Sequence, residues 1–161
     1  MNATNPRPRI FLDTSALFAG IWSVEGGSRI LLRLGESGAI SILVSSHVLD
    51  ELHSALTHKA PAILPLVAVL VDRARAEIVA APDDSHLRLA RGVTSHAGDA
   101  AVLAAAWQAL PDFFVTLDRQ HFLENPRLAE EVPFPVGTPG DALGWIRRRF
   151  LDDARGNAPG A

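Results

Sequence analysis

The chain has 161 residues, a formal net charge of −3 and a hydrophobic content of 48%, which predict one globular domain over residues 1–161. It contains no cysteine, so disulfides and thiolate metal sites are excluded, and any bound metal has to use oxygen or imidazole ligands. No apolar run reaches the roughly 18 residues of a membrane span and no secretory signal is recognisable, so we expect a cytoplasmic protein with no membrane partner.

Hydrophobic periodicity predicts strands and helices that alternate along the chain. In chain order we expect a strand over 9–13, a helix over 29–34 capped by Ser28, a strand over 39–44, helices over 47–58 and 62–76, a strand over 77–80, helices over 83–91 and 100–110, strands over 113–118 and 134–136, a helix over 141–152, and a frayed tail over 156–161. Strands that alternate with helices favour right-handed crossovers. We therefore predict a three-layer α/β/α fold with a central, mainly parallel sheet, whose core covers about residues 9–136.

Four acidic residues stand where these elements begin or end. Asp13 closes the first strand and Asp118 closes the fourth, Glu51 lies on the helix after the second strand, and Asp99 begins the helix that leads into the fourth. In a parallel sheet such positions converge on the carboxyl edge, where α/β folds bind their ligands. Carboxylates gathered without basic partners repel one another unless a divalent cation neutralises them. The pattern predicts a metal-dependent active site.

Each acid also has an ordinary structural interpretation. Asp13 is a suitable cap for the turn after its strand, Asp99 is a favourable acid at a helix N-terminus, and Asp118 is a common turn residue. Glu51 is adjacent to Asp50, which is a second candidate for the same position. The residues alone therefore leave both interpretations open.

Four segments together resemble the PIN-domain ribonucleases, and most closely the VapC-type toxins of bacterial toxin–antitoxin pairs. These segments are residues 12–17 (LDTSAL), 48–52 (VLDEL), 98–106 (GDAAVLAAA) and 115–122 (VTLDRQHF). The resemblance implies a PIN-like fold and an endoribonuclease that uses Mg²⁺ or Mn²⁺ and leaves a 5′-phosphate and a 3′-hydroxyl. It implies that Asp13, Glu51, Asp99 and Asp118 are the catalytic and metal-binding residues. It also implies an RNA substrate, a homodimer and a small cognate antitoxin as partners.

Hydroxyl residues near the first and last acids are secondary candidates. In the family such residues often support a metal-bound water or a ligand, which would assign this role to Thr14, Ser15 and Thr116. A local hydroxyl-to-backbone hydrogen bond is an equally good interpretation of each. The chain lacks the further acids that some relatives carry, at positions 102–103 and 119–120 here. The sequence therefore leaves open whether one or two metal ions bind.

Other protein classes and site types fit the sequence less well or remain as alternatives. The six histidines are not predicted to form a ligand set, although His96 and His121 lie near the predicted site and could contact phosphate. A haloacid-dehalogenase-type phosphatase would need an acid in place of Ser15 and a well-placed lysine, and the only lysine is Lys59. A PIN-like domain that binds RNA or protein without cleavage, and a housekeeping RNA-processing nuclease, both remain alternatives.

Overall fold

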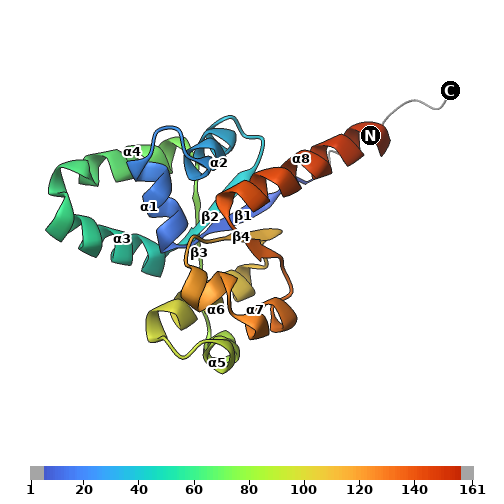
Figure 1. Cartoon of the computed structure of the whole chain (residues 1–161). Coiled ribbons are helices and arrows are strands. Elements are labelled where there is room, and N and C mark those ends of the chain that lie inside the picture. The colour runs from blue at the N-terminus through green and yellow to red at the C-terminus, as the bar shows by residue number, and fades with distance from the viewer. Residues whose placement is uncertain (1–5, 157–161) are drawn as a thin grey trace.

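A five-stranded sheet with helices on both faces forms the centre of the protein in the computed structural model, which describes residues 6–156 (Figure 1). All of its strand pairs are parallel, in the order β3-β2-β1-β4-β5, so the predicted α/β/α fold is confirmed. The elements are β1 (Arg9–Leu12), α1 (Thr14–Trp22), α2 (Gly27–Glu36), β2 (Ser41–Ser45), α3 (Ser46–Lys59), η1 (Pro61–Ile63), α4 (Leu64–Arg73), β3 (Glu77–Val79), α5 (Asp84–Val93), α6 (Ala97–Ala109), β4 (Phe113–Val115), the short π-helix η2 (Arg119–Leu123), α7 (Pro126–Glu131), β5 (Val136–Gly137) and α8 (Pro139–Gly156).

The strand order reverses at the middle of the sheet. The chain moves outward from β1 through β2 to β3, and then returns to the other side of β1 with β4 and β5. The register pairs Phe11 with Phe114 and Leu12 with Val115, so β1 and β4 end side by side. Open α/β sheets bind ligands in the crevice beyond such a switch point, because the connections after the two strands lead to opposite faces.

Helices cover both faces of the sheet. In Figure 1, α5, α6 and α7 lie below the sheet, α1 and α2 lie above it, α3 and α4 extend to its left, and α8 runs to the upper right. The central strands are therefore buried on both sides, which explains why they are continuously apolar rather than alternating. The rings of Phe11 and Phe114 stack across β1 and β4 with centroids 5.4 Å apart, and both residues are fully buried.

Several predicted boundaries were wrong, and α1 was missed. Residues 14–22 form a helix directly after β1, with Asp13 as its N-cap rather than as the end of the strand. Nearly all of this segment is apolar or small, so its sequence carries little helical periodicity. Helix α2 begins at Gly27 with Gly26 as its N-cap, so Ser28 is not the cap.

The last helix is longer than predicted. α8 covers 139–156 instead of 141–152, because Thr138 and Asp141 form reciprocal hydrogen bonds that begin it earlier. Gly156 belongs to this helix, and the rest of the predicted tail lies outside the described residues. No helix within residues 6–156 is long and apolar enough to cross a membrane.

Candidate active site

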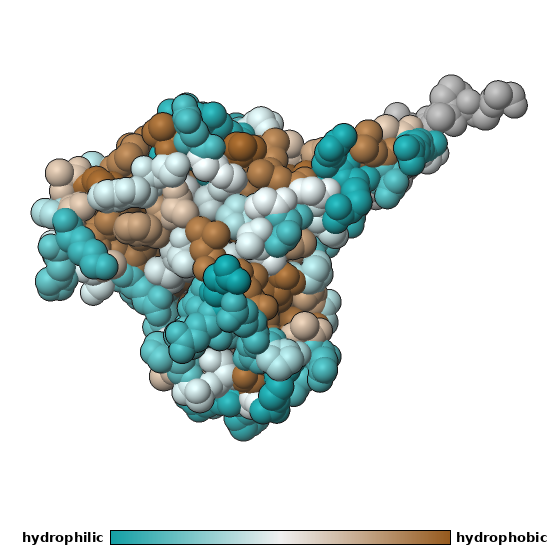
Figure 2. Space-filling view, in the orientation of Figure 1, coloured by the Kyte–Doolittle hydropathy of each residue, from teal (hydrophilic) through white to brown (hydrophobic). Residues whose placement is uncertain are grey.

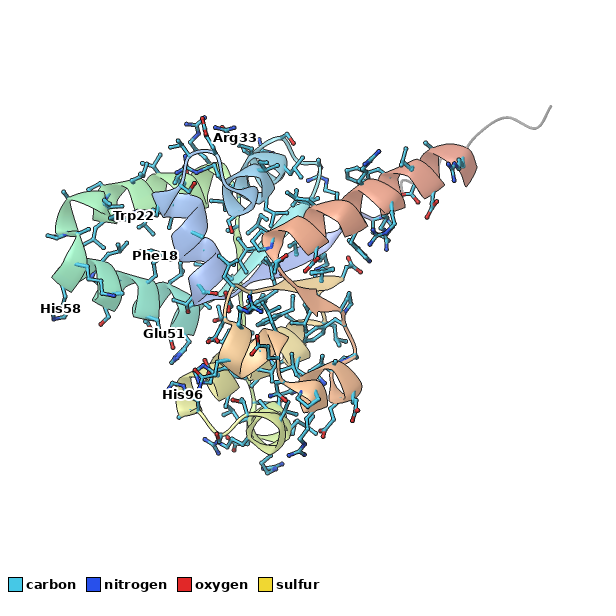
Figure 3. The ribbon with its side chains drawn as sticks, in the orientation of Figure 1. Phe18, Trp22, Arg33, Glu51, His58 and His96 are labelled. Carbon is cyan, nitrogen blue, oxygen red and sulfur yellow. The ribbon has the colours of Figure 1, made fainter. Side chains whose placement is uncertain are left out.

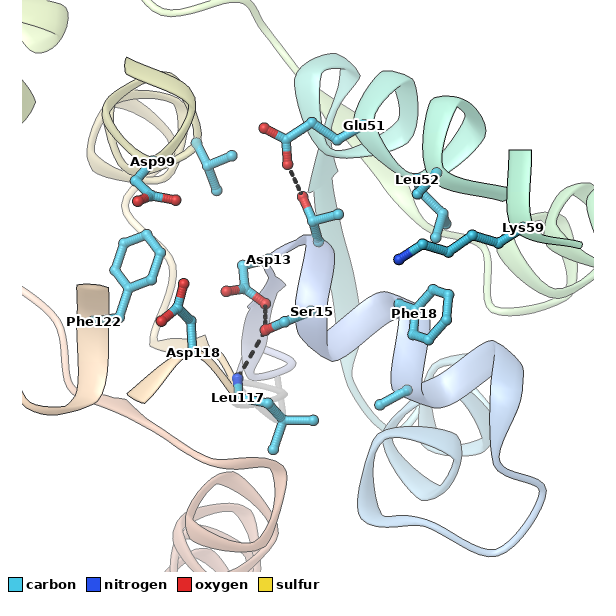
Figure 4. A pocket seen from close by; sticks show the side chains of 14 residues that line it. Asp13, Ser15, Phe18, Glu51, Leu52, Lys59, Asp99, Leu117, Asp118 and Phe122 are labelled. Carbon is cyan, nitrogen blue, oxygen red and sulfur yellow. Dashed lines mark hydrogen bonds between the residues drawn. The ribbon is translucent and has the colours of Figure 1, made fainter. Parts of the chain in front are cut away.

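A cleft of about 430 Å³ opens beyond the carboxyl ends of β1 and β4, and all four predicted acids line it (Figure 4). Asp13 follows β1, Asp118 follows β4, Glu51 comes from α3, and Asp99 lies in the first turn of α6. The cleft lies at the switch point of the sheet. Residues that are more than 100 positions apart in the sequence therefore meet in one place.

Asp13 is held by hydrogen bonds that position both of its carboxylate oxygens. Its Oδ1 accepts from the backbone N–H of Ala16 at 2.8 Å and from the Ser15 hydroxyl at 2.7 Å, and its Oδ2 accepts from the Thr116 hydroxyl. The first of these bonds is a helix N-cap, so the structural interpretation of Asp13 is correct as far as it goes. It does not explain why the residue is only 3% exposed.

The surface helix α5 supplies an internal comparison. Asp83 caps α5 with the same two bonds, from the backbone of His86 and the hydroxyl of Ser85, and these bonds hold the pKa of Asp83 below its ordinary value. Burial instead raises the pKa of Asp13 from 3.8 to about 6, although hydrogen bonds from Thr116, Ala16 and Ser15 oppose the shift. Asp83 makes its capping bonds from an exposed position, so capping does not require the burial of Asp13, which is an additional cost.

Ser15 and Thr116 connect the first acid to the loop of the fourth. The Ser15 hydroxyl accepts a hydrogen bond from the backbone N–H of Leu117 at 2.9 Å, and the Thr116 hydroxyl accepts one from the backbone N–H of Asp118 at 2.9 Å. Both hydroxyls donate to Asp13, so each bridges the acid to the β4–η2 loop. These hydrogen bonds hold the Asp13 carboxylate against the β4–η2 loop.

Glu51 is anchored from both sides of the cleft. The Thr14 hydroxyl donates to its Oε2 at 2.6 Å, and the His47 Nε2 lies 2.7 Å from its Oε1. A Cβ atom at Gly98 would lie 3.0 Å from Oε1, so the carboxylate lies close against the start of α6. This places Glu51, rather than the exposed Asp50, among the residues that line the cleft.

Asp99, Asp118 and His121 form the tightest group of potential ligands. One ligand atom from each lies within 4.8 Å of the others, and the described residues contain no second group of this kind. His121 Nδ1 lies 2.9 Å from Asp118 Oδ2 and 3.5 Å from Asp99 Oδ2. The hydrogen bond to Asp118 raises the pKa of His121. Desolvation acts to raise the pKa of Asp118, but hydrogen bonds from His121 outweigh it and lower this pKa.

Asp99 is the least satisfied acid in the cleft. Its Oδ2 is buried and has no hydrogen-bond partner within the described part of the chain, and His96 Nδ1 lies 3.3 Å away. Burial raises the pKa of Asp99, against the opposing effect of His121 and His96. A buried carboxylate oxygen without a partner is costly unless a cation binds it. The donor set of carboxylates and one imidazole fits a divalent metal such as Mg²⁺ or Mn²⁺.

The structure thus gathers the predicted acids in one cleft but does not pack them equally. Asp99 and Asp118 share the tight group with His121, whereas Asp13 and Glu51 lie outside it and carry hydrogen bonds of their own. His121 was interpreted from the sequence as a residue near the site, and the structure places it against two of the acids.

A spacing signal for the histidines was present in the sequence. His47 precedes Glu51 by four residues, His96 precedes Asp99 by three, and His121 follows Asp118 by three, and each pair is in contact. Residues three or four apart are neighbours on a helix, so Glu51, Asp99 and Asp118 could each have been assigned a histidine partner.

Comparisons with known proteins agree with this architecture. A chain in the crystal structure of VapBC2 from Rickettsia felis, bound to a DNA fragment from their promoter, has a similar fold, with a TM-score of 0.57 and 15% sequence identity over 81% of this chain and 98% of that chain. No curated protein sequence matches the chain significantly. The family model of the PIN domain matches residues 9–120, which contain all four predicted acids. The chain therefore belongs to the PIN-domain family.

Proposed function

We propose that this protein is an endoribonuclease that requires Mg²⁺ or Mn²⁺. The observation that carries the proposal is the group of Asp99, Asp118 and His121, in which the buried Oδ2 of Asp99 has no hydrogen-bond partner in the described part of the chain. The group lies at the switch point of a PIN-domain sheet, beside two further acids. Membership of the PIN family supports a nuclease, and the specificity for RNA rests on the sequence resemblance.

The residues have different roles in this proposal. Asp99 and Asp118 would hold the metal. Glu51 would add a further negative charge to the site from the α3 side of the cleft. A bound Mg²⁺ or Mn²⁺ supplies charge neutralisation for a phosphodiester and activates water. Asp13 lines the same cleft, and its Oδ2 accepts a hydrogen bond from Thr116, so this carboxylate would add negative charge beside the metal. Ser15, Thr14 and Thr116 would act by positioning these acids.

We further propose that the protein is the toxin of a type II toxin–antitoxin pair in the cytoplasm. The fold similarity to a chain of VapBC2 and the VapC-like segments support this assignment. Exposed hydrophobic side chains on α4, Leu66 and Val69, are 41% and 49% exposed and would suit an antitoxin or a second copy of the chain. Figure 2 shows hydrophobic surface in the region that α1, α3 and α4 enclose.

Expression of the protein alone in bacteria is expected to arrest growth, and Asp118→Ala is expected to relieve the arrest. The substitution removes a carboxylate from the proposed metal group and the hydrogen bonds that hold His121. Growth curves of cells with matched protein levels measure the effect. Asp50→Ala, which removes an exposed acid on α3, should remain as toxic as the wild type.

Two results would contradict this account at different levels. A wild-type protein that is well expressed and harmless would remove the toxin assignment, and RNA cleavage by that same protein would favour a housekeeping nuclease. Undiminished toxicity of Asp118→Ala would remove Asp118 from the metal site.

A further inference from the structure

The cleft has a second half that the proposed metal chemistry does not use. Beyond the acids its walls are formed by Phe18 from α1 and by Leu52, Ala55 and Lys59 from α3. In Figure 4 the Lys59 side chain extends over Phe18, with its amino group directed into the cleft. This half is therefore aromatic and aliphatic, with one positive charge.

Two helical stripes build this half of the cleft. Thr14, Phe18 and Trp22 recur every four residues on α1, and Glu51, Ala55 and Lys59 recur every four residues on α3. The two stripes begin at the 2.6 Å hydrogen bond between Thr14 and Glu51. Eight residues of helix rise about 12 Å, so each stripe extends about 12 Å from the acids. This length leaves room for a nucleotide beside a phosphate held at the metal group.

Phe18 offers a supported aromatic face. Its ring is half-buried and stacks on the indole of Trp22, with centroids 5.7 Å apart and an angle of 11° between the planes. Figure 3 shows the two side chains one turn apart on α1. Trp22 is 58% exposed, so the aromatic pair continues from the cleft to the surface. Proteins bind single-stranded nucleic acid by stacking its bases on such rings.

Lys59 supplies the charge that a neighbouring phosphate needs. It is the only lysine in the chain and the only basic residue among the described residues that line the cleft. Within residues 6–156 its amino group has no hydrogen-bond or ion-pair partner. A cation in the last turn of α3 suits the helix dipole, but this does not explain its direction over Phe18. An unpaired ammonium beside an aromatic wall matches a phosphate next to a base.

We propose, resting on the ribonuclease function above, that this half of the cleft is a nucleotide subsite of single-stranded RNA. The base next to the scissile phosphate stacks on the half-buried ring of Phe18 beside Ala55, and the following phosphate contacts the amino group of Lys59. A basic peptide segment fits less well, because Lys59 would repel it at the end of the cleft away from the acids.

Binding of a fluorescein-labelled oligouridylate octamer, followed by fluorescence anisotropy in EDTA, tests the subsite separately from cleavage. Phe18→Leu should weaken binding roughly 5- to 100-fold, because stacking on one aromatic ring is lost. Lys59→Gln should make the plot of log affinity against log salt concentration shallower by about 0.7, the value for one phosphate contact on a single strand. An abasic octamer should bind Phe18→Leu and wild type equally well.

Matched controls separate the subsite from general effects. Phe150→Leu and Arg155→Gln change an exposed aromatic residue and an exposed cation on α8, which projects away from the cleft (Figure 1), and both should bind as wild type does. Phe18→Trp keeps an aromatic ring at this position and should bind the octamer about as tightly as wild type. This result would show that binding depends on an aromatic ring and that the protein tolerates a substitution at position 18.

The subsite assignment is wrong if Phe18→Leu and Lys59→Gln bind the octamer as wild type does. It is also wrong if Phe150→Leu and Arg155→Gln lose as much affinity for the octamer as the two subsite variants lose. A labelled basic peptide can be titrated in the same way. If Phe18→Leu and Lys59→Gln weaken binding of that peptide and leave binding of the RNA octamer unchanged, the pocket belongs to a protein partner and the proposal is overturned. A wild-type protein that binds the octamer through these residues but never cleaves RNA would contradict the proposed function and leave the subsite standing.

Discussion

Asp13→Asn is expected to lower the rate of RNA cleavage roughly 100-fold or more. The same substitution is expected to stabilise the fold at neutral pH. Asparagine can still cap α1 through its side-chain oxygen, and its amide group can face Thr116. What it removes is the charge that burial makes unfavourable. A substitution that keeps the shape of the residue but loses activity would identify the charge of Asp13 as the functional property.

The gain in stability should depend on pH in a defined direction. The pKa of Asp13 is about 6 in the folded protein and has its ordinary value of 3.8 when unfolded, so the folded state binds more protons between these values. Stability contributed by this residue is therefore present below about pH 4 and is lost as the pH rises to about 6. At about 1.4 kcal/mol per pKa unit the cost above pH 6 is roughly 3 kcal/mol.

Urea denaturation of wild type and Asp13→Asn at pH 4 and at pH 8 measures this effect. The free energy of unfolding of the variant should exceed that of wild type by roughly 1–3 kcal/mol at pH 8, and the difference should shrink to less than about 1 kcal/mol at pH 4. Ser15→Ala leaves the charge in place and serves as the control, which should be destabilised at both pH values. A variant that is less stable than wild type at pH 8 would show that the buried charge is compensated within the folded protein.

Asp99→Asn is expected to remove the stabilisation of the protein by Mn²⁺. A ligand that binds only the folded state at 100 times its Kd adds about 2.7 kcal/mol, which raises the Tm of a chain of this size by roughly 5–10 °C. Asparagine at position 99 would take away the carboxylate whose buried Oδ2 has no hydrogen-bond partner among residues 6–156, with only His96 and His121 within ion-pair distance. The shift in Tm on addition of Mn²⁺ should therefore fall close to zero in the variant.

The comparison has to use the shift rather than the Tm itself. Burial raises the pKa of Asp99, so the metal-free variant is expected to be more stable than metal-free wild type. Asp50→Asn, which changes an exposed acid on α3 outside the cleft, should keep the full shift. Equal shifts in Asp99→Asn and wild type would place the metal elsewhere.

The fold could be predicted to a large extent because its strands are buried on both faces. Apolar runs such as residues 113–115 and 42–44 are visible in the sequence, and the alternation with helices implies the parallel sheet. Helix α1 could not be predicted, since it packs several sides against neighbours and its apolar residues follow no clear period. Its cap at Asp13 was taken for the end of the strand.

The site was predictable as a set of acids but not as a geometry. The sequence indicated that Asp13 and Asp118 close strands of one parallel sheet, and the structure shows that these strands are neighbours and that both acids line one cleft. That Asp99 and Asp118 pack closely with His121 depends on how α6 and η2 meet in space, which no local pattern encodes. The Lys59 side of the cleft likewise depends on the angle between α1 and α3.

The most direct test of the account is the cleavage of a 5′-labelled RNA by the purified protein with Mn²⁺ and with EDTA, beside Asp99→Asn and Asp50→Asn prepared in the same way. We expect wild type and Asp50→Asn to cleave in Mn²⁺ and not in EDTA, to leave 5′-phosphate and 3′-hydroxyl ends, and to exceed Asp99→Asn by roughly 100-fold. Cleavage that persists in EDTA, or that is equally fast in Asp99→Asn, would contradict a metal-dependent ribonuclease built on this carboxylate cluster.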